Sequence, residues 1–247
     1  MIRMALFATL ALAGCDSRRA IIVQIQVPDL GGVETPIPGV LIAALPYDRD
    51  SILAAMEQRA ATPRPTTQGL DSLFAAFHPP FLAFSRIAWE VERATRRRDS
   101  IAKAHADAAT GTPAASELTI RRDALNDTIA RLAPELERTR TALAAARDTL
   151  WPRMERLRSG VRAWEQQTYA GYDTVVRTQS VDKMRQLIAD TSDARGWAVL
   201  RIAGDNWWVY ARSPDPQDPH FHWYWNIRVT GDTIRLNAST GRRLPRY

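Results

Sequence analysis

Five aromatic and polar side chains near the carboxyl end of the chain have the composition of a ligand-binding surface. In an extended strand alternate residues share a face, so Trp208 and Tyr210 lie together, as do Tyr224, Asn226 and Arg228. Aromatic rings stack on the apolar faces of sugars, and amide and guanidinium groups add hydrogen bonds. One interpretation of these five residues is therefore a platform for cell-wall glycan.

The second interpretation of this face is structural. An exposed aromatic patch of this size is unusual, so helices from the middle of the chain would pack over it, through Trp164 and Tyr169. On this interpretation the opposite face, which carries Trp207 and Trp225, fills the core. Exposure of the rings of Trp208, Tyr210 and Tyr224 distinguishes the two interpretations.

Other candidate chemistry is sparse. His220 and His222 lie two residues apart on an expected strand, but no third ligand follows with metal-site spacing, and Asp215 and Asp218 lie in a proline-rich loop. We expect no metal site and interpret the two histidines as part of an edge strand.

The sequence also lacks the motifs that mark common catalytic sites. It contains no H-E-x-x-H, G-x-S-x-G or phosphate-binding G-x-x-x-x-G-K-[ST] motif. A hydrolase would require the fold to bring His220 or His222 beside an acid and a nucleophile. We therefore expect neither an enzyme nor a cofactor.

The only cysteine of the chain, Cys15, follows a short apolar run over 4–13. That run is too short for a permanent membrane-spanning helix. It ends in Leu12-Ala13-Gly14-Cys15, which resembles the bacterial lipobox, where the cysteine thiol takes a diacylglyceryl group. The resemblance implies a signal peptide over 1–14 and a lipidated tether over 15–20. The alternative is a cysteine buried in an apolar N-terminal helix.

Lipidation at Cys15 would decide the localisation of the protein. Each buried CH₂ of an acyl chain contributes about 0.8 kcal/mol, and the two or three chains of a bacterial lipoprotein together hold it firmly. We expect a protein anchored in the cell envelope, at the inner or the outer membrane, facing the periplasm or the exterior. Asp16 resembles the residue that retains lipoproteins at the inner membrane in some enteric bacteria, and the choice of membrane stays open.

The chain has 247 residues and a formal net charge of +6, and 31 of its 33 basic residues are arginine. Acidic and basic residues are interspersed, so we expect no nucleic-acid partner. A basic tail over 241–247 either contacts anionic head groups or is solvated. No small-molecule ligand can be named from the sequence.

The hydrophobic pattern changes period twice along the chain. Period-2 alternation predicts strands over 21–27 and 40–45, and again over 196–202, 206–212, 220–229 and 233–237. Between them, helices are expected over 51–61, from about 68 to 109 with a kink or restart at His78-Pro79-Pro80, and from Ser116 onward. Tyr172–Val176 is a candidate short strand.

The longest expected helix has an apolar heptad seam, which predicts an antiparallel coiled hairpin with the helix before it. The first seam comprises Leu118, Leu125, Ile129, Leu132, Leu136, Leu143, Leu150, Met154, Leu157, Val161 and Trp164. The partner seam comprises Phe84, Ile87, Val91, Ala94, Ile101 and Ala108.

The strands resemble those of carboxypeptidase regulatory-like (transthyretin-like) domains. Val23–Val27 followed by the Pro38-Gly39 turn into Val40–Leu45 is similar to the opening of that family, and Ser192-Asp193-Ala194-Arg195-Gly196-Trp197 is similar to its T-D-x-x-G-x-F hairpin. In such a hairpin Asp193 can bond the backbone of its own turn, and Gly196 supplies the positive φ that the turn needs. Trp207-Trp208-Val209-Tyr210-Ala211 resembles its Y-x-V-x-A strand. Members of the family usually serve as non-catalytic accessory, adhesion or folding-support modules.

Together these observations predict an α+β protein, in which a transthyretin-like antiparallel β-sandwich is split by a long antiparallel α-helical hairpin. The expected sandwich comprises 21–48 and 172–247, and the insertion comprises 49–171, with the hairpin helices over about 69–109 and 116–169. The expected function is a non-catalytic, membrane-anchored envelope lipoprotein with a structural or protein-interaction role through the hairpin. The alternative is a glycan-binding module.

Overall fold

The computed structural model describes residues 18–108, 111–182 and 184–247. Cys15 and the expected signal peptide lie outside these residues, whereas 18–20, expected to belong to the tether, already form part of the first strand. The helices are α1 (Arg49–Glu57), α2 (Gln68–Ala106), α3 (Pro113–Thr168) and α4 (Tyr172–Asp182). The strands are β1 (Arg18–Pro28), β2 (Glu34–Pro36), β3 (Leu41–Leu45), β4 (Ile188–Thr191), β5 (Trp197–Ala203), β6 (Trp208–Pro214), β7 (Phe221–Arg228), β8 (Thr233–Leu236) and β9 (Arg242–Pro245).

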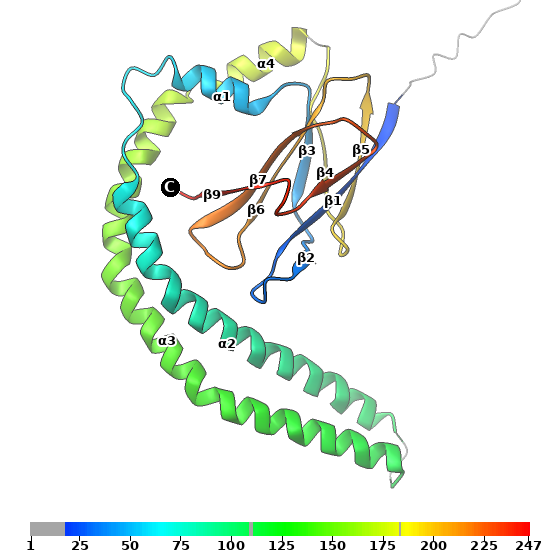
Figure 1. Cartoon of the computed structure of the whole chain (residues 1–247). Helices are drawn as coiled ribbons and strands as arrows, with labels where there is room; N and C mark the ends of the chain where they lie inside the picture. The colour runs from blue at the N-terminus through cyan, green and yellow to red at the C-terminus, as the bar shows by residue number, and fades with distance from the viewer. Residues whose placement is uncertain (1–17, 109–110, 183) are drawn as a thin grey trace, which may run out of the picture.

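The strands form two sheets, each of which combines strands from both ends of the chain (Figure 1). In the first sheet β1 lies between β5 and its other partners, β2 and β8. The second sheet has the order β4-β3-β6-β7-β9. The expected α+β class and the split of the β structure around a helical insertion are confirmed. The pairing is antiparallel except between β1 and β8, which run parallel, so the prediction of a purely antiparallel sandwich is wrong at this pair.

The two sheets share one hydrophobic core, and we call them together the β-body. Strand β1 alternates buried and exposed side chains, as an amphipathic strand must when one face is packed and the other is not. The largest fully buried side chains of the core include Trp207 and Trp225. The predicted assignment of these two tryptophans to the core face is confirmed.

One tight turn of the β-body has the chemistry that the sequence predicts. The Oδ1 atom of Asp193 accepts hydrogen bonds from the backbone N–H groups of Arg195 (2.8 Å) and Trp197 (2.9 Å). Gly196 has a φ of 76°, in the left-handed region. A Cβ atom there would collide with the carbonyl oxygen of Ile25, so the turn requires glycine for both its conformation and its packing.

Helices α2 and α3 form the expected antiparallel hairpin, and each predicted seam residue on α2 is at least partly buried. Helix α2 continues through Pro79 and Pro80, and α3 contains Pro134 and Pro152. The helix therefore does not restart at Pro79. The whole hairpin is curved in Figure 1. Helix α3 begins at Pro113, before the expected start at Ser116, and Thr112 caps it, because its hydroxyl accepts from the N–H of Ala115.

Two other expectations are wrong in the structure. Tyr172–Val176 lies in helix α4 rather than in a strand, and its apolar side chains pack against α1 and the second sheet. The basic tail is not simply a solvated end, because Arg242–Pro245 pair with β7 as strand β9, whereas contact of its arginines with head groups stays a prediction. No helix in the described part of the chain combines the length and apolarity that crossing a bilayer requires.

Candidate functional site

The outer face of the second sheet carries the residues that the sequence predicts for a binding platform. Trp208 and Tyr210 lie on β6, and Tyr224, Asn226 and Arg228 lie on β7. The strand register places Tyr210 opposite Asn226 and Trp208 opposite Arg228. The rings of Tyr210 and Tyr224 meet edge to face at 5.8 Å. The structure thus brings these five residues together on one face.

The first turn of α1 covers the middle of this face. Tyr224 donates its hydroxyl hydrogen to Asp50, and Asn226 donates from Nδ2 to Oδ1 of Asp48 at 2.6 Å. The guanidinium of Arg49 lies 5.0 Å from the ring centre of Tyr210 and 5.8 Å from that of Tyr224. Only 3% of Tyr224 is exposed, and its burial together with the hydrogen bond to Asp50 raises the pKa of its phenol to about 12.

Helices α1 and α4 complete the cover. Trp208 and Tyr210, which are half-buried, pack against five side chains of these helices: Ile52, Met56, Tyr172, Val175 and Val176. Trp164 and Tyr169, which the sequence suggests as the covering residues, are not in this cluster. The indole of Trp164 donates to the carbonyl of Thr62, and the hydroxyl of Tyr169 donates to Glu57 of α1. Arg228 is the one exposed member of the five, and it donates to Asn206. Tyr224 is thus buried and Trp208 and Tyr210 are only partly exposed, so the three rings do not form the open platform that the glycan interpretation requires.

Beside this covered region the same sheet face borders a groove of about 1460 Å³. Strands β6, β7 and β9 supply one side of the groove, and α1, the segment 64–67 and the end of α3 supply the other. Its ionisable side chains are five arginines and four carboxylates, together with His222. Sequence reasoning did not find this groove, because its two sides come from segments that are about 40 residues or more apart in the chain.

A second cluster fixes the base of the hairpin to the β-body. Leu70, Phe74 and Phe77 of α2 pack with Met154 and Val161 of α3, and Phe221 and Tyr247 lie against them. The ring of His220, which is 2% exposed, stacks on Phe74 with 4.4 Å between ring centres and an interplanar angle of 5°. We call these eight residues the hairpin anchor.

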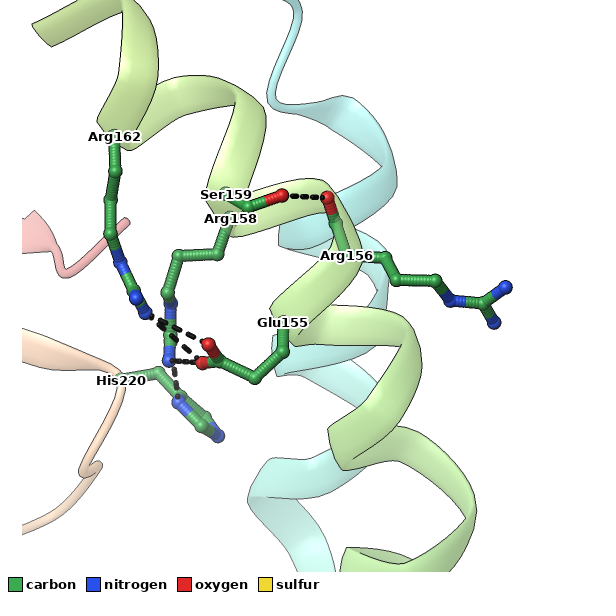
Figure 2. A network of polar contacts seen from close by, with 6 residues as sticks. All are labelled: Glu155, Arg156, Arg158, Ser159, Arg162 and His220. Carbon is green, nitrogen blue, oxygen red and sulfur yellow. Dashed lines mark hydrogen bonds and ion pairs between the residues drawn. The ribbon is translucent and has the colours of Figure 1, made fainter.

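Arg158 joins the hairpin anchor to a charged network on α3 (Figure 2). Its Nη2 atom lies 3.4 Å from Nδ1 of His220, and its Nη1 atom donates to Glu155 at 2.9 Å. Arg162 also donates to Glu155, at 3.1 Å. Because an arginine can only donate, Nδ1 of His220 accepts, and the ring is neutral with its proton on Nε2.

The charge state of His220 follows from its surroundings. Burial lowers the pKa of His220 to about 4; the neighbouring Asp218 raises it, whereas Arg158, Arg246 and His78 lower it further. Sequence reasoning placed Leu157 on the hairpin seam and missed Arg158. In the structure Leu157 is 48% exposed and Arg158 is buried.

The residues considered for metal binding or catalysis have other partners. Asp215 and Asp218 are buried in ion pairs with Arg243, rather than held in a loose loop. The described residues include no group of three or more histidine, cysteine or carboxylate side chains placed to hold a metal ion. Within the same residues, neither the ring of His220 nor that of His222 is hydrogen-bonded to a hydroxyl group.

Comparison with known proteins adds no relative to this description. No protein-family model, curated protein or solved structure matches the chain.

Proposed function

We propose that this chain is a non-catalytic lipoprotein of the bacterial cell envelope that presents a rigid helical arm to a protein partner. The arm comprises residues 84–106 of α2 and 113–142 of α3. Acylated Cys15 would hold the protein at the inner or the outer membrane, with the β-body facing the periplasm or the exterior. The β-body would be a transthyretin-like module that carries the arm.

The observation that carries the proposal is the contrast between the two ends of the hairpin. At its base, the hairpin anchor buries aromatic and aliphatic side chains against β7 and the chain end. Beyond residue 84 the helices pack on one another, and Figure 1 shows their far end clear of both sheets. At 1.5 Å per residue the α2 part of the arm extends roughly 35 Å. A long element fixed at one end only is suited to reach a partner.

The transthyretin-like assignment is supported by the turns and the strand order. The Asp193–Gly196 turn has the side-chain hydrogen bonds and positive φ that the family resemblance implies. Both sheets combine strands from before and after the insertion, as a module with an inserted hairpin requires.

The interaction role is tested by photocrosslinking in intact envelopes. A photoreactive residue at Ile120, which is 69% exposed near the tip of the arm, is compared with one at Val199, which is 45% exposed on β5. We expect a discrete adduct from position 120 alone. Deleting 85–98 and 124–137, two heptads from each helix, keeps position 120, shortens the arm in register by about 21 Å and should abolish that adduct. Adducts of the same pattern at both positions, or none at either, would contradict the proposal.

The anchoring role has a separate test. Cys15→Ser should abolish labelling by a radioactive fatty acid and move the protein from the membrane fraction to the soluble fraction. Cys15 is the only cysteine of the chain, so no other thiol can substitute for it. Unchanged membrane retention of the variant would refute lipid anchoring.

A further inference from the structure

The groove beside the second sheet holds more positive charge than its own carboxylates neutralise. Arg242 is paired with Asp50, and Arg64 is paired with both Glu57 (3.9 Å) and Glu165 (3.0 Å). Within the described residues, the other groove arginines, Arg49, Arg212 and Arg246, form no ion pair with a carboxylate. Asp173 is the one groove carboxylate that lacks an arginine partner there.

Asp173 offsets the charge of only one of these three arginines. Burial is the main cause that raises the pKa of the Tyr47 phenol. The charge of Asp173 also raises this pKa, whereas the charge of Arg49 lowers it. Asp173 and Arg49 therefore both lie near Tyr47, at the α1–α4 end, where their charges offset one another. The guanidinium of Arg212 lies over the same two rings as that of Arg49, those of Tyr210 and Tyr224. Since neither Arg212 nor Arg246 is paired with a carboxylate among the described residues, the β6–β9 end of the groove has a net positive charge.

Strand register brings Arg212 and Arg246 to either side of His222. On β6, Arg212 lies opposite Tyr224, which is two residues from His222 on the same face of β7. On the other side, Leu244 of β9 lies opposite His222, and Arg246 is two residues further along. Diagonal neighbours of this kind are within reach of long side chains.

Two aromatic rings pack against the guanidinium of Arg212. Its guanidinium lies 5.5 Å from the ring centre of Tyr224 and 6.0 Å from that of Tyr210. Rings beneath a guanidinium fix its plane and leave its N–H groups directed outward, so little freedom is lost when it binds.

One ring nitrogen of His222 lacks a hydrogen-bond partner in the structure. Its Nε2 atom is buried and has no hydrogen-bond partner. A buried polar atom without a partner costs free energy, which a ligand that supplies the missing bond recovers. Burial first, and then Arg212 and Arg246, lower the pKa of His222 to about 4, so at neutral pH the ring is uncharged and can donate one hydrogen bond.

We propose that this end of the groove binds an oxyanion, a phosphate or carboxylate group of a small soluble ligand. Arg212 and Arg246 supply two guanidinium forks, the group that matches the planar geometry of these anions. His222 donates from Nε2 to a third position on the ligand. This role is independent of the proposed function of the arm, since no arm residue lines the groove.

Binding is tested by isothermal titration calorimetry of the full β-body and hairpin with inorganic pyrophosphate and, separately, with citrate. Saturable binding of pyrophosphate alone assigns a phosphate ligand, and saturable binding of citrate alone assigns a carboxylate ligand. Arg212→Gln and Arg246→Gln should each weaken the preferred probe at least tenfold. Arg201→Gln, which removes the same charge from an exposed position on β5, should not. Unfolding midpoints establish that each variant is folded, and Arg246→Gln lies beyond the last strand, where folding is least affected.

An independent readout comes from the titration of His222. An anion held between the arginines should move the pKa of His222 upward from about 4, and the change is visible in the NMR signal of its ring C–H. The proposal is overturned if neither probe binds saturably, if Arg201→Gln weakens binding as much as the groove variants, or if bound ligand leaves the His222 titration unchanged.

Discussion

Arg158 on α3 directs its Nη2 atom at Nδ1 of His220, 3.4 Å away, across the junction between the hairpin and the β-body. Both side chains are buried, and the ring of Phe74 lies parallel to that of His220 and under the guanidinium of Arg158, 5.4 Å from it. A histidine that accepts from an arginine must be neutral. The junction therefore depends on a histidine that stays unprotonated.

The first prediction concerns pH. In the folded chain the pKa of His220 is about 4, whereas the unfolded value is near 6.5. Between these values the unfolded state binds more protons, so stability is complete above pH 6.5 and falls as the pH drops toward 4. We expect His220 to account for a loss of about 1–2 kcal/mol in the free energy of unfolding between pH 7 and pH 5. Urea titrations at a series of pH values measure this loss.

The matched variants for this prediction are His220→Phe and His105→Gln. The first keeps an aromatic ring on Phe74 but cannot be protonated, so its pH-dependent loss should be smaller than that of the wild type. The second removes a histidine on the arm and should leave the loss as it is. Equal pH dependence in His220→Phe and the wild type would show that His220 is not the group that titrates.

The second prediction concerns the hairpin anchor. Phe74 is 1% exposed, and Phe74→Ala should cost about 3–5 kcal/mol and free the base of the hairpin from β7. Hydrogen exchange should then accelerate in the first turns of α2. Leu132→Ala removes a buried side chain from the arm instead, so it should accelerate exchange near position 132 and leave the base protected. Accelerated exchange at the base in both variants, or in neither, would contradict a separate anchor.

The third prediction concerns the cover over the second sheet. Asp48 caps α1, because its carboxylate accepts from the N–H of Asp50 (3.0 Å) and from the hydroxyl of Ser51 (2.7 Å), and it also accepts from Asn226. Asp48→Ala removes all three bonds and should cost about 1–2 kcal/mol, with faster hydrogen exchange in α1. Ser51→Ala removes one of them and should cost less. An equal cost for both variants would mean that the bond to Asn226 does not hold the cover.

The fourth prediction compares two glycines with nearly the same backbone angle. Gly196 and Gly39 have φ values of 76° and 75°, so alanine costs about 1 kcal/mol at either position through its left-handed conformation alone. At Gly39 nothing lies within 4 Å of the added Cβ atom, whereas at Gly196 it meets the carbonyl oxygen of Ile25. Gly196→Ala should therefore lower the unfolding midpoint much further than Gly39→Ala. Similar midpoints would place the whole effect in the backbone conformation.

Much of the β-body was predictable because its signals are local. Alternation along β6 and β7 assigns Trp207 and Trp225 to the core, and the Asp193–Gly196 turn depends on residues four apart or fewer. Strands β2, β4 and β9 were not predicted, since each is short and acquires its conformation by pairing with a distant partner.

The candidate sites were less predictable, and for a physical reason. Period 2 shows that Tyr224 and Asn226 share a face, but not that Asp50 and Asp48, more than 170 residues earlier, cover it. Heptad spacing predicts that Leu157 is buried against α2. In the structure Arg158 is buried instead, because this part of α3 faces the β-body. A hydrophobic pattern does not identify an arginine that is buried through partners on another element.

The interleaved order of the sheets has a consequence for how the chain acquires its structure. Strand β1 pairs with β5 and β8, so residues 18–28 must wait for residues beyond 196 before their sheet exists. Contacts between segments so far apart form slowly, whereas the α2–α3 hairpin closes a short loop and can form early. The hairpin can thus fold while β1 is still unpaired with β5 and β8, and the addition of these later strands would complete the β-body.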